Sequence, residues 1–184
     1  MACEQLNKSF RDNMCKTSIG GLKAVYFISD ADPLGTTLTY VSNTDKIDTI
    51  SGGNPTLYKY DLDSFASSFD QTIVSSREAG TSMFEQKLSI NIKGLTFERH
   101  KEIKLLTYGM FKVIVADQNS NFWLMGWEYN ADVTGGSIVT GTAMADKSSY
   151  TLELTARERK PAMFFDDTTE ANVLTAISGT LQGY

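Results

Sequence analysis

Residues 84–93 read FEQKLSINIK, and this run alternates between apolar and polar side chains. Phe84, Leu88, Ile90 and Ile92 fall on one side of the period-2 pattern, and charged or small polar residues fall on the other. Successive side chains of a β-strand point to opposite faces of a sheet. The run therefore predicts a strand with one face in a hydrophobic core.

Two hairpins are predicted on the C-terminal side of this strand. Residues 110–127 contain two apolar segments around the polar loop 117–121, as hairpins with longer loops require. Residues 150–157 alternate in the same way as 84–93, and they pair most simply with a strand through Ile138, Val139 and Met144.

Three further segments complete the prediction. Residues 22–28 read LKAVYFI between Gly-Gly and a turn-rich stretch, which indicates a central strand. Residues 57–75 alternate partially and indicate one or two strands, and residues 161–165 indicate a short edge element.

A single short helix is predicted at about 96–108. Thr96 can cap its first turn, and Gly109 follows as a stop signal. Phe97, Ile103 and Leu106 can share one helix face. The expected fold class is mainly β, an antiparallel β-sandwich or barrel with this helix and long polar loops.

The chain is expected to form one domain. Its 184 residues suit a single core. Residues 1–20 are polar and indicate an N-terminal arm, and residues 21–184 form the β-rich domain. Within that domain, residues 29–56 are dominated by polar and turn-forming types. A connection of this length is typical of a functional loop, an interaction element or a segment with its own hairpin, and we consider it a candidate assembly loop.

Composition disfavours several classes of protein. The formal net charge of −5 opposes affinity for nucleic acid through phosphate contacts. No apolar run approaches the roughly 18 to 20 residues of a membrane span. The N-terminus lacks the pattern of a signal peptide, so synthesis in the cytoplasm is expected. Cys3 and Cys15 are then expected to be free thiols.

No motif for catalysis, cofactor binding or metal binding is found. The chain contains neither of the glycine-rich phosphate-binding motifs, G-x-x-x-x-G-K-[ST] and G-x-G-x-x-G. It also lacks the G-x-S-x-G motif that holds a nucleophilic serine. His100 is the sole histidine, and on the predicted helix it is expected to lie at the surface. With Cys3 and Cys15 it does not supply four zinc ligands. We therefore expect a protein that is not an enzyme and has no cofactor.

The acidic pairs and the two tryptophans each have a structural interpretation beside a functional one. The acidic pairs Asp30/Asp32, Asp61/Asp63 and Asp166/Asp167 suit solvated turns, although paired carboxylates can also cleave a glycosidic bond. Trp123 and Trp127 stand four residues apart, a spacing that puts both on one side of an extended strand. They form either a stacking platform for sugars or, as we expect, part of a core or interface.

Residues 140–162 read TGTAMADKSSYTLELTARERKPA, and this run resembles the C-terminal portion of virion structural proteins from phages and prophages of Bacteroidetes. Cys15 followed by Gly20-Gly21, the strand with Val25-Tyr26, and the hairpin from Val115 to Gly126 are similar to the same family. The resemblance covers most of the chain outside residues 29–75.

This resemblance implies a tail-tube subunit with a β-sandwich or barrel and a flanking helix. The resemblance implies that such subunits assemble into stacked hexameric rings around a channel that DNA passes through. Expected partners are further copies and other tail or neck proteins, with no specific nucleic-acid binding and no membrane, in a virion assembled in the host cytoplasm. The polar segment 29–56 equally suits a neck connector ring or a decoration protein, and a small carbohydrate-binding module is the remaining alternative.

Overall fold

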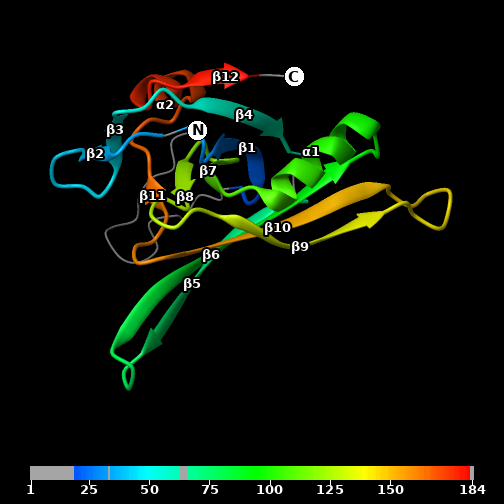
Figure 1. Cartoon of the computed structure of the whole chain (residues 1–184), viewed down its shortest axis with the longest axis horizontal. Helices are drawn as coiled ribbons and strands as arrows, with labels where there is room; N and C mark the ends of the chain where they lie inside the picture. The colour runs from blue at the N-terminus through cyan, green and yellow to red at the C-terminus, as the bar shows by residue number, and fades with distance from the viewer. Residues whose placement is uncertain (1–18, 33, 63–65, 183–184) are drawn as a thin grey trace, which may run out of the picture.

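The structure is a computed structural model, and it describes residues 19–32, 34–62 and 66–182. Two β-sheets pack face to face, with a helix near the end of each (Figure 1). This is the mainly β, sandwich-like fold that the sequence predicted. Both predicted hairpins and the edge element at residues 161–165 are present. The prediction of Met144 in the same strand as Ile138 and Val139 is wrong, because that strand ends at Val139 and Met144 is an exposed residue of the following turn. Cys3, Cys15 and most of the N-terminal arm lie outside the described residues.

The first sheet has four antiparallel strands in the order β5-β6-β10-β9. Its centre consists of β6 (Thr81–Lys93) and β10 (Ser149–Glu158), and its edges are β5 (Ser68–Ser76) and β9 (Asp132–Val139). The strand predicted from alternation is therefore the longest one in this sheet. Its Leu88 and Ile90 are fully buried, as the alternation requires.

The second sheet has six strands in the order β11-β8-β7-β1-β4-β12. The central strand β1 (Leu22–Ser29) pairs antiparallel with β4 (Thr56–Asp61) and β7 (Phe111–Asp117). The remaining strands are β8 (Phe122–Met125), β11 (Met163–Phe164) and β12 (Thr180–Gln182). The central position predicted for residues 22–28 is confirmed.

Two apolar clusters lie on the two faces of the six-stranded sheet. One lies between the sheets and includes Val25, Phe27 and Leu154. The other lies on the far side, where Tyr26 and Ile28 of the same strand pack beneath Ile47 and Ile50. Because β1 is covered on both faces, it is a continuous apolar run, as expected for a strand without a solvated side.

The far-side cluster explains the polar segment 29–56. This segment holds a hairpin of its own, β2 (Thr37–Tyr40) and β3 (Ile47–Ser51), whose Ile47 and Ile50 are 1% exposed. One of the three interpretations is therefore confirmed. The long polar segment 29–56 thus contains a hairpin, because a few apolar residues spaced among polar ones suffice to cover the sheet.

The helix α1 (Phe97–Tyr108) forms where it was predicted, and the Thr96 side chain accepts the Arg99 N–H at 3.3 Å. Ile103 and Leu106 enter the core between the sheets, but Phe97 is 82% exposed. The shared face predicted for Phe97 is therefore wrong. The prediction of a single helix is also wrong, because a second helix, α2 (Glu170–Ala176), covers the far-side cluster through Val173. Among the described residues, no helix is long and apolar enough to cross a membrane.

Candidate assembly surface

The four-stranded sheet ends in two long strands. β5 has nine residues and β9 has eight, and in the part of the chain that the structure describes no further strand pairs with the outer side of either. Neither strand contains lysine or proline, the residues that most often protect a sheet edge, and each has a single aspartate. Long edges of this kind are templates for another strand.

The hydrogen-bond ladder shows which backbone groups are available at these edges. Gly94 donates its N–H to the Ser148 carbonyl at 3.0 Å, and this bond sets the alternation along β6, β10 and their neighbours. Backbone N–H groups alternate in direction along each strand, and the residue pairs between the strands carry this alternation from β6 to β10 and β9. The N–H groups of Ser137 and Val139 therefore point toward β10, whereas that of Ile138 points outward. On the opposite edge, the N–H groups of Ile73 and Ser75 point outward.

The two edges are also staggered along the strand direction. β5 pairs with residues 81–89 of β6. β9 pairs with residues 149–155 of β10, and these residues pair in turn with residues 87–93 of β6. The offset is six residues at one end (81 against 87) and four at the other (89 against 93). Over four strands this is about one to one and a half residues per strand, close to the stagger of closed barrels whose strands tilt by roughly 35–45°.

The β5–β6 hairpin extends beyond the sandwich as an arm (Figure 1). From the Gln71–Gln86 pair to the Ser76–Thr81 pair it runs for five residues, or about 17 Å at ~3.4 Å per residue. Ile73 on this arm is 67% exposed and Val74 is 41% exposed. The arm thus presents apolar side chains on both faces outside the core.

A second exposed apolar surface lies on α1, beside the other edge of the sheet. Leu105 is 63% exposed and Tyr108 is 82% exposed, and Met110 follows at 58%. Phe97, Leu105 and Tyr108 recur at spacings that put them on one helix face, opposite the buried Ile103 and Leu106. We call Leu105, Tyr108 and Met110 the helix patch.

The outer face of the four-stranded sheet is polar. Lys87 and Glu153 form an ion pair at 2.9 Å, and Arg157 and Glu85 form another at 3.1 Å. Exposed pairs of this kind add little stability. They do place a carboxylate beside each of these cations, so the face offers few isolated positive charges.

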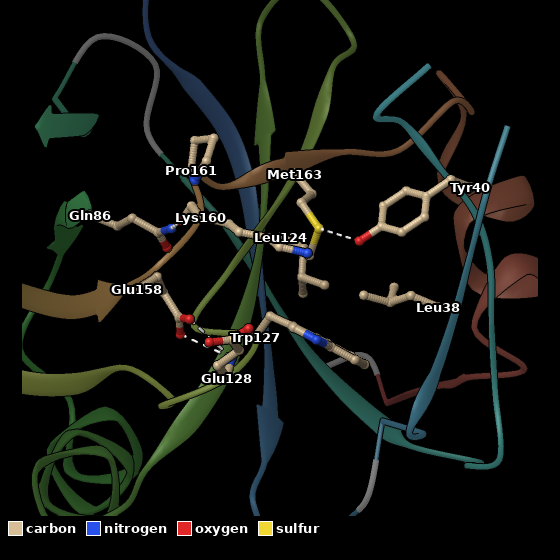
Figure 2. A pocket seen from close by; sticks show the side chains of 10 residues that line it. All are labelled: Leu38, Tyr40, Gln86, Leu124, Trp127, Glu128, Glu158, Lys160, Pro161 and Met163. Carbon is tan, nitrogen blue, oxygen red and sulfur yellow. Dashed lines mark hydrogen bonds between the residues drawn. The ribbon is translucent and has the colours of Figure 1, made fainter. Parts of the chain in front are cut away.

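A small cavity lies where the two sheets meet the chain that follows β8 (Figure 2). Its volume of about 40 Å³ is far below the several hundred Å³ of ligand sites. Glu158 on its wall is 4% exposed, and its carboxylate accepts the N–H groups of Glu128 at 3.0 Å and Tyr129 at 2.9 Å. Burial raises the pKa of this carboxyl above its ordinary value, against the lowering effect of the two N–H groups.

Gln86 lies on the same wall and is 1% exposed. Its side chain accepts the Gly126 N–H at 3.2 Å and donates to the Lys160 carbonyl at 3.4 Å. The side chains of Gln86 and Glu158 therefore both form hydrogen bonds with backbone groups, and these bonds connect the two sheets at this cavity.

A larger groove of about 730 Å³ lies between α1 and β4. Two of its polar side chains have partners: Lys59 pairs with Glu170 at 2.9 Å, and the Tyr60 hydroxyl donates to Glu102 at 3.2 Å. Burial raises the pKa of Tyr60 well above its usual range, so this phenol stays protonated. The groove has the size of a ligand site, but Lys59, Tyr60 and Glu102 on its wall already bind groups of the protein.

His100 and the acidic pairs lie apart. His100 is exposed on α1, with its ring 6.2 Å from that of Tyr150. Asp30 accepts from Asn130 at 3.0 Å, and Asp61 pairs with Lys59 at 3.5 Å. Asp63 lies outside the described residues.

The third acidic pair sits in the loop before α2. Asp166 pairs with Lys46 at 3.0 Å, and Asp167 accepts from Asn172 at 3.1 Å. The structure thus places Asp30, Asp61 and Asp166 at three separate positions, each with its own partner. Within the described ranges, no three histidine, cysteine, aspartate or glutamate side chains gather as a metal site.

The predicted arrangement of Trp123 and Trp127 on one side of a strand is wrong. β8 ends at Met125, and Gly126 turns the chain with φ +73°, where a Cβ would lie 2.8 Å from the Ala131 nitrogen. Trp123 packs against the cluster between the sheets, and Trp127 packs against the far-side cluster. Since the two rings lie on opposite faces of the six-stranded sheet, they form no joint platform.

The sequence did not reveal the edges, the arm, Gln86 or Glu158 as important positions. Gln86 is a polar residue among the apolar positions 84, 88, 90 and 92, and Glu158 follows the apolar positions 150, 152, 154 and 156 at the same spacing. A polar residue at a position that the alternation directs into the core was therefore the available signal. No protein-family model matches the chain, and no curated protein matches it either.

Proposed function

We propose that this chain is a virion structural protein, a tail-tube subunit whose copies close into stacked rings around a channel for DNA. Support for closure comes from the two matched edges of the four-stranded sheet. The strands alternate in direction, and their number is even. A copy rotated about an axis roughly along the strands therefore brings its β9 antiparallel to β5 of the next copy, with outward N–H groups on both strands.

Such a contact is heterologous, because two different surfaces meet, and it forms a ring when the rotation closes. The stagger of the edges supports closure, since each added copy would continue the sheet with the tilt of a barrel. The polar outer face would then line the channel. Its ion pairs leave few isolated cations for phosphates, which suits DNA in transit without specific binding. Hexameric rings in a virion, with other tail or neck proteins as partners, follow from the family resemblance.

The test is assembly of the purified chain, followed by light scattering and electron microscopy. Rings or tubes are expected for the wild type. Ile138→Pro removes an outward N–H of β9 and is expected to give a folded monomer. Ser137→Pro is the matched control, because it removes an N–H directed at β10 and should lower the thermal stability instead.

A wild-type chain that stays monomeric up to millimolar concentration contradicts the proposal. Rings that persist unchanged in Ile138→Pro contradict the edge pairing.

A further inference from the structure

The arm of the β5–β6 hairpin carries an apolar pair that its own body does not cover. Along the core side of β5, Phe69 still packs on Trp123, with ring centroids 6.0 Å apart. Ile73, four residues further on the same side, is 67% exposed, and its cross-strand partner is the half-buried Phe84. The core side of the sheet thus continues past the end of the core.

At the opposite edge, α1 covers the core side of β9. Ile103 and Leu106 of α1 are in the same cluster as Ala131, and Val133 of β9 packs against it. The helix runs along β9 in the reverse direction: Gly94, just before it, bonds to Ser148 near the end of β9, and Phe111, just after it, pairs with Ala131 at the start. The helix patch therefore lies beside the first half of β9 and faces away from its own core.

We infer that Ile73 and Phe84 on the arm of one copy pack against the helix patch, Leu105, Tyr108 and Met110, of the next copy in the ring. This inference rests on the proposed ring. When β9 of one copy lies antiparallel to β5 of its neighbour along their full lengths, Ile73 falls opposite the Thr134–Gly135 region of β9. The helix patch is then on the same side of the extended sheet as Ile73.

Area and charge both favour a second copy as the occupant. Ile73, Leu105, Tyr108 and Met110 are 58–82% exposed, and over the two surfaces they expose on the order of 500 Å², about a third of the roughly 1,600 Å² that a standard interface buries in total. The distal arm, residues 72–85, has two acidic residues and one basic residue. Lys101 and Lys104 flank Leu105 on the exposed side of α1.

Two single substitutions and their mixture test the interface. Ile73→Asp damages the arm alone, and Leu105→Asp damages the helix patch alone. Both side chains are exposed, so each variant should melt like the wild type. Each is expected to need at least a tenfold higher concentration than the wild type to assemble. Val74→Asp, on the other face of the same strand, is the matched control and should assemble within about threefold of the wild type.

The mixture gives a signature that general loss of solubility does not. At a concentration where each variant alone is monomeric, an equimolar mixture contains one intact arm and one intact helix patch. It is therefore expected to form dimers of one copy of each variant, measured by light scattering and native mass spectrometry, and to stop there.

Rings of Ile73→Asp and Leu105→Asp that form at the wild-type concentration overturn this interface, and if Ile138→Pro still prevents them, the edge-paired ring stands without it. A mixture that stays monomeric also overturns the pairing of arm and helix. A monomeric wild type overturns the ring and the interface together.

Discussion

The two sheets of the sandwich differ at their edges. The six-stranded sheet ends in β11 and β12, of two and three residues, and β12 covers only the first half of β4. The four-stranded sheet ends in strands of nine and eight residues without lysine or proline. Short edge strands discourage pairing with other chains, and long ones permit it. The comparison teaches that, among the described residues, the long open edges belong to the four-stranded sheet.

The comparison of the two sheets depends on the buried face of β6, a central strand of the four-stranded sheet, so the largest effect is expected from a substitution in that face. Ile90→Asp places an ionised carboxylate in the core, where Ile90 is fully buried, and should cost several kcal/mol and prevent folding. Circular dichroism and a thermal melt measure this. Ser137→Asp, on an exposed residue of the same sheet, is the control, and a cooperative melt of Ile90→Asp near the wild-type temperature would show that the face is wrong.

The next effect concerns the link between the two sheets. Glu158→Ala leaves the N–H groups of Glu128 and Tyr129 without their acceptor, which should cost about 1–3 kcal/mol in urea unfolding. Glu158→Gln keeps an acceptor oxygen and should cost less. A loss as large for the glutamine variant as for the alanine variant would contradict the role assigned to the acceptor.

The same carboxyl predicts a pH dependence. Its folded pKa is raised above the unfolded value of 4.5, so the folded state binds the proton more tightly. Wild-type stability relative to Glu158→Gln should therefore rise as the pH falls from neutral through the folded pKa, with the full increment present below 4.5. Urea melts of both proteins between pH 4 and 7 measure the difference, and a difference that shrinks toward low pH would contradict this sign.

A smaller effect on stability is expected at the β12 edge of the six-stranded sheet. Removing residues 180–184 deletes β12, whose Leu181 is only half-buried, and should cost roughly 1 kcal/mol without changing the oligomeric state. Light scattering and a thermal melt report the two quantities. Loss of assembly in this truncation would show that the six-stranded sheet also supplies an interface.

The smallest effect is expected at the positions that an enzyme would use. His100 and Asp166 are exposed and Asp167 is half-buried, so His100→Ala and the double change Asp166→Asn/Asp167→Asn should each cost less than about 0.5 kcal/mol and leave particle morphology unchanged. Under the proposed function, the infectivity of phage that carry each change is the functional measurement. Normal tubes on non-infectious particles would point to chemistry at these residues.

Alternation and turn chemistry predicted much of the fold. The strand at 84–92, the hairpin at 110–127 and the helix capped by Thr96 are all local patterns, and they form where predicted. The pairing of β5 with β6 and the stagger of the edges depend on registers between distant segments, which a single sequence does not contain. Phe97 was misplaced because a helix face is chosen by its neighbours, and Trp127 because Gly126 reverses the chain.

Glu158 and Gln86 have a mechanical consequence. Both belong to the four-stranded sheet, and the N–H groups that they accept belong to residues 126–129, directly after β8 of the six-stranded sheet. Apolar contacts between sheets resist separation but have no preferred position along a sliding direction, whereas hydrogen bonds of fixed geometry do. Sliding one sheet over the other must therefore break these bonds at the start, so the sandwich should transmit a force along its strands as a rigid block.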